Sequence, residues 1–331
     1  MDSRRSANAS AAPRAGGGRE ASPSADAPAA PAGASRVPRP SGRAAAAGDA
    51  ALLVCAVLWG TTFPLTKLAM AHSTPLAFTA FRFCLATVAL VPLALRGPGL
   101  AGLWRARWWG CGVGLLVAAG FWLQTYGLTR ISSPRSAFLT AFYVFFTLGL
   151  EWLVFRRPPG WWVAGGAALA FVGVAVMTGA GAGDPINSGD VATLVCALTF
   201  AGQMVLLSGA LKRHDPGQIL FLEIGSCAVL SIVAAPLFET PRLDWSAPLV
   251  ATALYLALIA TALVLGLQNF GQKRTTASRA GVLFSSEPVW TTVFAAAFFG
   301  EVVTGRTLVG GALVLGGLLV TTLAPRPAPH A

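Results

Sequence analysis

Long apolar stretches recur between residues 49 and 323 and constrain the fold of this chain more than any other feature of its sequence. Each stretch has about 18–23 residues, the length that an α-helix needs to cross the hydrocarbon core of a bilayer. Only 11% of the residues are charged, whereas about a quarter are charged in soluble domains, so lipid must cover much of the surface. The sequence therefore predicts an all-α integral membrane protein with ten transmembrane helices, at 49–71, 75–95, 109–129, 136–155, 161–180, 190–211, 217–238, 247–270, 279–299 and 306–323.

The chain outside these stretches is polar or low in complexity. Residues 1–47 are rich in Ala, Pro, Gly, Ser and Arg and contain no apolar run, so they are predicted to be a disordered tail without a signal peptide. Residues 324–331 form a short C-terminus. Both ends are predicted to be cytoplasmic, which requires an even number of spans.

The distribution of cations sets the predicted orientation in a plasma (inner) membrane. Basic residues resist translocation and stay on the cytoplasmic side. With a cytoplasmic tail, nine cations fall in cytoplasmic connections and four in outer ones: Arg96, Arg105, Arg107, Arg156, Arg157, Lys212, Arg213, Lys273 and Arg274, against Arg130, Arg135, Arg242 and Arg306. The net charge of +11 thus has a topological explanation, and no basic groove with interleaved aromatic residues favours nucleic-acid binding.

The chain also repeats itself. Segment 48–56 resembles segment 189–197 at an offset of 141 (189 − 48), and both contain Gly, Asp, Leu, Val, Cys and Ala at matching places. A unit of five spans is odd, so the second copy must enter the membrane from the opposite side, and two such inverted halves can open a shared site alternately to each side. We therefore predict two inverted five-helix repeats, at 48–183 and 184–323. Other matching residues are Pro75 and Pro216 (216 − 75 = 141), and Gln124 and Gln268, Arg130 and Arg274, and Arg135 and Arg279 (279 − 135 = 144).

Several short motifs lie at characteristic places in these repeats. They are Trp59-Gly60 followed by Thr61-Thr62-Phe63-Pro64, then Phe81-Arg82-Phe83, Glu287-Pro288-Val289, Gly300-Glu301, Gly310-Gly311-Ala312 and Gly316-Gly317. With these motifs the chain, over about 48–323, resembles the EamA-like group of the drug/metabolite transporter superfamily. The resemblance implies a solute exporter or exchanger of the plasma membrane, with a central cavity lined by helices 1–4 and 6–9. The first half departs from the pattern, because Tyr143-Val144 replaces a Glu-Pro pair and Arg157 stands where the second half has Glu301.

Ionisable residues inside spans are candidates for function, since each costs roughly 2.5–3.5 kcal/mol to insert. Glu287 is a candidate proton-coupling or substrate-ammonium site, and Arg82 or Lys67 a candidate site for a substrate carboxylate. The alternatives are a structural ion pair, or a Lys67 side chain that reaches the interface. Glu223 is the repeat counterpart of Arg82 (223 − 82 = 141), so the two either pair or lie at mirrored depths.

The remaining candidates are one carboxylate near the interface, the glycine-rich spans, and uncharged polar and aromatic residues. Glu151 lies near Arg156 and Arg157, which predicts an interfacial salt bridge. The glycine-rich fifth and tenth spans predict close helix packing, either within the chain or in a homodimer. The polar and aromatic candidates for the cavity wall, which would bind a zwitterionic or hydroxylated solute or else bond neighbouring helices, are Gln124, Gln203, Gln268, Asn269, Tyr143, Trp59 and Trp290.

The favoured function is a secondary transporter that exports or exchanges a small polar metabolite, such as an amino acid, or drugs. Its expected partners are that solute, membrane lipid and a proton or counter-solute. The alternatives are an intramembrane enzyme acting on lipid, and a channel. No HExxH, GxSxG or GxxxxGK[ST] motif is present, and the cysteines and histidines form no ligand set, so no enzyme activity, metal or cofactor is predicted.

Overall fold

The computed structural model of the chain describes residues 42–96, 99–131, 133–156, 158, 160–178, 185–299 and 303–323. The predicted tail up to residue 41, the C-terminus 324–331, and Arg157, Gly300 and Glu301 lie outside these residues. The first helix begins at Gly42, seven residues before the predicted start of the first span (49 − 42). The third span begins at Gly99, ten residues before its predicted start (109 − 99).

The described residues are almost entirely helical, as the sequence predicts. The elements are α1 (Gly42–Trp59), α2 (Thr62–Ala69), α3 (Pro75–Ala94), α4 (Gly99–Leu128), α5 (Ser133–Thr140), α6 (Tyr143–Phe155), α7 (Trp161–Thr178), α8 (Ser188–Ala210), α9 (Pro216–Phe238), α10 (Ala247–Ala257), the π-helix η1 (Leu258–Leu263), α11 (Val264–Gln272), α12 (Ala277–Phe284), α13 (Glu287–Phe299) and α14 (Gly305–Leu323).

The predicted all-α membrane fold is confirmed. Among the described residues, eight helical segments are long and apolar enough to cross a membrane, and three of these join consecutive elements: α1 with α2, α5 with α6, and α10 through α11. The fifth predicted span is the shorter helix α7. The ninth is divided between α12 and α13.

Four of the ten predicted spans contain an interruption that the sequence analysis did not predict. The first is broken at Gly60-Thr61, the fourth at Ala141-Phe142 and the ninth at Ser285-Ser286, and the eighth contains η1. At Gly60 the reason is close packing, since a Cβ atom there would lie 2.8 Å from Trp290 Cβ. At the ninth span the hydroxyls of Ser285 and Ser286 donate hydrogen bonds to the carbonyls of Val282 and Leu283, and such local bonds compete with helix continuation.

The ends of several helices follow directly from the sequence. Pro75 and Pro216, which match between the two repeats, each occupy the first turn of a helix, where the missing N–H is no loss. Asp215 caps α9 by accepting from the backbone N–H groups of Gly217 and Gln218. The corresponding start of α3 is capped from the other half, because Glu239 accepts from the N–H of Ala77 at 2.8 Å.

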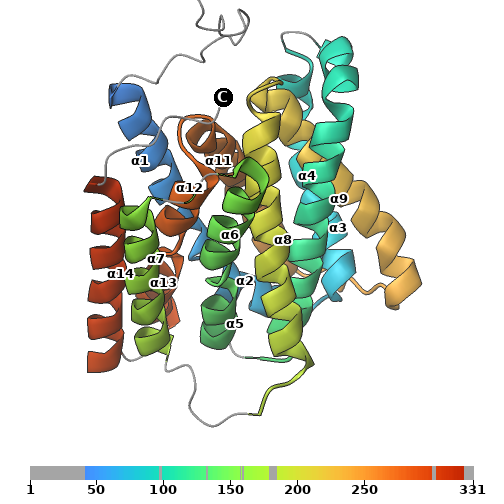
Figure 1. Cartoon of the computed structure of the whole chain (residues 1–331). Coiled ribbons are helices and arrows are strands. Elements are labelled where there is room, and N and C mark those ends of the chain that lie inside the picture. Colours follow the sequence, from blue (N-terminus) through green and yellow to red (C-terminus); the bar gives the residue numbers. More distant parts are fainter. Residues whose placement is uncertain are drawn as a thin grey trace, which may run out of the picture. The chain divides into compact units, whose positions relative to one another are not determined.

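Equivalent helices of the two halves make similar packing contacts with the opposite half. The fourth element α4 packs on α8 and α9, and its repeat counterpart, the α10–α11 segment, packs on α1 and α3. Helices α3 and α9, which are themselves counterparts, pack on each other, as do α7 and α14. In Figure 1, α1 begins at the upper end of the bundle and α8, its counterpart, begins at the lower end, so these two helices run in opposite directions.

The glycine-rich helices α7 and α14 cross backbone to backbone within one chain and stand side by side at the left of Figure 1. Gly173 faces Gly310, and Gly166 faces Gly317. A Cβ atom at Gly173 would lie 2.6 Å from both Gly310 O and Val314 N. Small residues permit this approach in lipid, where close van der Waals packing drives helix association.

Gly173→Ala should therefore destabilise the protein by about 1–3 kcal/mol, because the added methyl group meets backbone atoms that cannot move aside. Gly165→Ala is the matched control on the same helix, since a Cβ atom there would have nothing within 4 Å. Thermal melting in detergent compares the two variants. Equal melting temperatures would contradict the close α7–α14 crossing.

Candidate solute-binding cavity

A cavity lies between the two halves. Its volume is about 60 Å³, which holds a few water molecules. Residues from α1, α2, α4, α5, α6, α8, α11, α12 and α13 line it, so every interrupted span contributes: Trp59, Thr62, Val117, Phe121, Gln124, Thr140, Tyr143, Phe200, Gln203, Met204, Leu265, Gln268, Phe284 and Glu287.

Six of the ten predicted substrate-binding residues lie in the wall of this cavity. They are Trp59, Gln124, Tyr143, Gln203, Gln268 and Glu287. The other four do not line it. Lys67 is exposed on α2, and Trp290 is partly buried beside Gly60. Asn269 is buried and donates to Pro216 O at 3.4 Å.

Arg82 lies behind the cavity wall. Its guanidinium is stacked over the ring of Phe121, 4.9 Å from the centroid, and this ring lines the cavity. The Nε atom donates to Thr261 Oγ1 at 2.7 Å, and Nη2 donates to Ala260 O at 3.4 Å. Arg82 therefore binds the π-helix η1 and contacts no solute space unless Phe121 moves.

The π-helix η1 links Arg82 to the cavity. Trp59 Nε1, on the cavity wall, also donates to Ala260 O, at 3.2 Å. A π-helix displaces the regular hydrogen-bond ladder and leaves carbonyls available for side chains, and such segments are frequent at functional sites. Two donors from two other spans converge on this one carbonyl, which fixes the Trp59 ring.

Among the described residues that line the cavity, Glu287 is the one carboxylate. It stands in the first turn of α13, directly after the break at Ser285-Ser286. Five of the fourteen lining residues are aromatic, and two of them, Trp59 and Phe284, meet edge to face at 5.0 Å. A carboxyl group among aromatic faces matches a solute with a cationic group and an apolar body.

Sequence reasoning missed the phenylalanine and threonine residues of the wall. Phe121, Phe200 and Phe284 are indistinguishable in sequence from the other phenylalanines of an apolar span. Thr62 had a signal, since it belongs to the Thr61-Thr62-Phe63-Pro64 motif at the break of the first span. Thr140 lies beside the break of the fourth span, which no proline or glycine announces.

Glu151 and Glu223, two further carboxylates on described helices, both accept hydrogen bonds from uncharged groups. Glu151 on α6 accepts from the N–H of Ser278 at 2.7 Å and also from its hydroxyl, so it holds the first turn of α12. Glu223 on α9 accepts from Gln203 Nε2 at 2.9 Å. It does not bind Arg82, whose donors go to η1. The counterparts Arg82 and Glu223 thus serve different neighbours.

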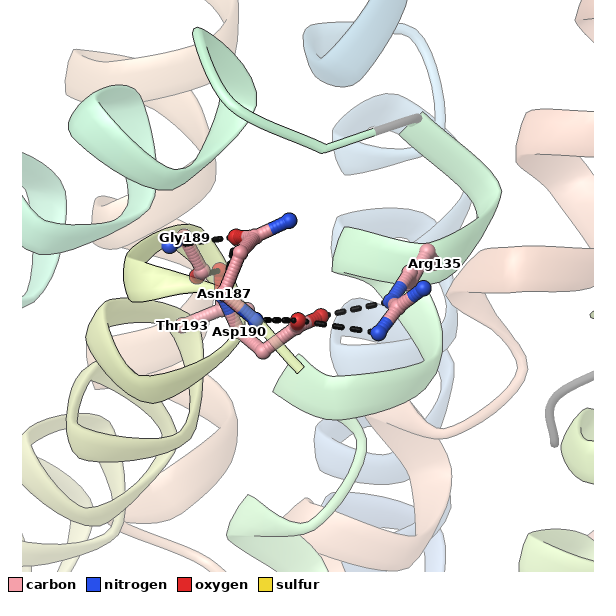
Figure 2. A network of polar contacts seen from close by, with 5 residues as sticks. All are labelled: Arg135, Asn187, Gly189, Asp190 and Thr193. Atoms are coloured by element: carbon pink, nitrogen blue, oxygen red, sulfur yellow. Dashed lines mark hydrogen bonds and ion pairs between the residues drawn. The ribbon is translucent and has the colours of Figure 1, made fainter. Parts of the chain in front are cut away.

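Two ion pairs join the halves at positions that match in the repeat. Arg135 on α5 binds Asp190 on α8 through two hydrogen bonds, of 2.5 and 2.9 Å (Figure 2). Arg279 on α12 binds Asp49 on α1 at 3.1 and 3.3 Å. Each pair crosses from one half to the other. Because α1 and α8 begin at opposite ends of the bundle, the pairs lie toward opposite ends as well.

The surroundings of the two pairs differ. Asp190 is also held by the start of its own helix, where Asn187 N–H donates to it at 2.8 Å (Figure 2). Arg279 additionally donates to the carbonyls of Thr321 and Thr322, which brings the end of α14 beside the first half of α1. The Arg279 side chain is 1% exposed and that of Arg135 is 25% exposed. The Arg279 pair is therefore the more deeply buried one.

The EamA-like transporter family matches the chain twice, over residues 46–179 and 187–323. An "uncharacterized transporter" of Archaeoglobus fulgidus is 29% identical over 275 residues, which cover 83% of this chain and 85% of that protein. A "probable amino-acid metabolite efflux pump" of Salmonella typhimurium is 25% identical over 292 residues, which cover 84% of this chain and 95% of that protein. A solved crystal structure has a TM-score of 0.70 at 22% identity and covers 85% of this chain and 98% of its own, a likeness of fold.

Proposed function

Because this chain belongs to the EamA-like transporter family and is a multi-pass membrane transporter, we propose that it is a secondary carrier that moves a small aminated metabolite by alternating access. The plasma membrane is its proposed location. The observation that carries the proposal is the single carboxylate, Glu287, in an aromatic cavity between the two halves.

The chemistry of the wall favours an amino acid or a related amine as the solute. Glu287 supplies a negative charge, and Trp59 and the neighbouring phenyl rings supply faces that attract a cation and pack against an apolar side chain. Gln124, Gln203 and Tyr143 add donors and acceptors for the polar groups of the solute. The name of the Salmonella relative, a probable amino-acid metabolite efflux pump, agrees with this class of solute and favours export.

The size of the cavity and the two ion pairs support alternating access. The cavity is small, with a volume of about 60 Å³, and we propose that the halves separate to admit an amino acid. The Arg135–Asp190 and Arg279–Asp49 pairs both cross between the halves and are both formed. We propose that each pair closes one end of the carrier and that only one opens at a time. The channel alternative would require both ends to open together.

Purified protein in liposomes tests the proposed function. The vesicles are loaded with a panel of radiolabelled amino acids, amines and carboxylic acids, and efflux is followed with and without a pH gradient. Aminated solutes should leave faster than from protein-free vesicles, and unlabelled solute outside should accelerate the exchange. Efflux of carboxylic acids alone would contradict the role given to Glu287.

A further inference from the structure

A cluster of buried amides and one carboxyl group lies directly behind the cavity. Glu223 on α9 is fully buried, and Gln268 and Asn269 on α11 are 2% and 1% exposed. Gln203 on α8 connects this cluster to the cavity, because it lines the cavity and donates to Glu223 Oε1 at 2.9 Å. Asn269 lies within hydrogen-bonding range of the same carboxyl group.

The hydrogen bonds of this cluster leave acceptors unused. Gln268 Nε2 donates to Gln203 Oε1 at 3.3 Å and to Gln272 Oε1 at 3.0 Å, and Gln272 Nε2 donates to Met204 O at 3.3 Å. Each amide nitrogen is therefore engaged. Among the described residues, three buried oxygens accept no hydrogen bond: Glu223 Oε2, Gln268 Oε1 and Asn269 Oδ1. Buried polar atoms are normally paired, so these three spare oxygens favour a ligand that binds oxygen.

The charged and titratable groups around Glu223 do not supply that ligand. From α3, Arg82 and Cys84 face Cys227, the thiol one turn beyond Glu223 on α9, and the donors of Arg82 go to η1. The segments α8 and α11 present only the amides of Gln203, Gln268, Gln272 and Asn269. A carboxylate buried without a bound cation is costly.

We propose that Glu223, together with the amide oxygens of Gln268 and Asn269, forms a binding site for a small monovalent cation, a proton or Na⁺. Both are hard cations that bind carboxylate and amide oxygens. A proton on Oε2 donates to one of the spare amide oxygens, and Na⁺ is bound by all three. The carboxyl group of this site differs from that of the cavity, since Glu287 lines the cavity and Glu223 does not.

The position of Gln203 and Gln268 connects this cation site to the solute. Both side chains line the cavity, and both belong to the Glu223 network. A cation at this site binds Gln268 Oε1 directly and also binds the carboxyl group to which Gln203 donates, so it changes which atoms of these two amides face the cavity. Only this coupling role rests on the proposed carrier function, because cation binding itself needs no solute.

The test compares Glu223→Gln with the unchanged chain in detergent, without any solute. Asp244→Asn is the matched control, because it removes one carboxylate from an exposed pair with Arg242, where the side chains are 55% and 50% exposed. Melting temperatures are measured in NaCl and in choline chloride at equal ionic strength. Infrared spectra in D₂O record the C=O band of protonated carboxyl groups at neutral pH.

If the site binds Na⁺, NaCl should raise the melting temperature of the unchanged chain and of Asp244→Asn by several degrees, and Glu223→Gln should lose this rise. If it binds a proton, Glu223→Gln should lose part of the protonated-carboxyl band that Asp244→Asn retains. If neither response depends on residue 223, the carboxylate is only a hydrogen-bond acceptor and the inference is overturned. If Glu223→Gln does not fold, Glu223→Asp replaces it, and an unchanged Na⁺ response with an unshifted band then overturns the inference. Because no transport is measured, these results are independent of whether the flux experiment succeeds.

Discussion

Glu287→Gln should lower gradient-driven flux of the solute by roughly 10- to 100-fold while the protein inserts and folds normally. A hydrogen bond to a charged group contributes about 1.5–3 kcal/mol, and each 1.4 kcal/mol corresponds to a tenfold change in affinity. Glutamine keeps the shape of the side chain and its acceptor oxygen but can neither bind a proton nor attract an ammonium group. Efflux from loaded liposomes, with solute concentration varied, measures the loss.

A structural role for Glu287 predicts a different result. The residue stands in the first turn of α13, where a negative charge stabilises the helix by about 0.3–1 kcal/mol. If that were its only role, Glu287→Gln would lower the melting temperature slightly and leave flux intact. Asp244→Asn, with its exposed side chain, is the control for loss of a carboxylate. Full proton-driven activity of Glu287→Gln would remove this residue from the mechanism.

Arg279→Gln should shift the carrier strongly toward the state in which the Arg279–Asp49 end is open. Removing one partner of a buried ion pair costs about 3–5 kcal/mol, since the remaining charge loses that partner in a buried place. Asp49 is only 7% exposed, so this cost falls on the state with that end closed. At 1.4 kcal/mol for each factor of ten, the populations should change by at least about 100-fold. Adding Asp49→Asn should reverse much of the shift.

Two native cysteines lie on the helices that carry the two aspartates and can be used to follow the opening of the two ends. Cys55 follows Asp49 by six residues on α1 (55 − 49), and Cys196 follows Asp190 by six on α8 (196 − 190). Both are fully buried. With the other cysteines replaced by alanine, Arg279→Gln should increase maleimide labelling of Cys55 and leave Cys196 protected.

Arg135→Gln provides the reciprocal experiment and should expose Cys196. Its effect should be smaller, because the Arg135 side chain is 25% exposed and solvent screens the charge left behind. Simultaneous labelling of both cysteines in either variant would indicate general loosening and would contradict the exchange between two closed ends.

The sequence predicts most of the fold because membrane spans have a strong local signal. Apolar length places nearly every helix, and the offsets of 141 and 144 identify Asp49 with Asp190 and Arg135 with Arg279 as matching residues. The sequence did not indicate that each arginine binds the aspartate of the other half. That pairing depends on how helices 230 residues apart meet, which no local pattern encodes.

Only part of the candidate site could be predicted, again because contacts between distant helices have no local sequence signal. Polar residues in an apolar span are conspicuous, so Gln124, Gln203 and Glu287 could be identified as candidates. Arg82 is equally conspicuous, yet the structure places it behind Phe121, where it binds the π-helix. The cost of inserting a charge shows that it needs a partner, but whether that partner is a solute or the protein is decided by the packing of other helices.

The crossing of α7 and α14 also determines where the carrier can bend. Backbone atoms that already touch at Gly166–Gly317 and Gly173–Gly310 cannot slide apart without opening voids that lipid tails are too large to fill. With the proposed alternating access, we therefore expect this edge to be the hinge between the two halves. The largest separation is then expected where α3 packs on α9, and a bulky lipid or inhibitor bound there should hold the carrier in one state.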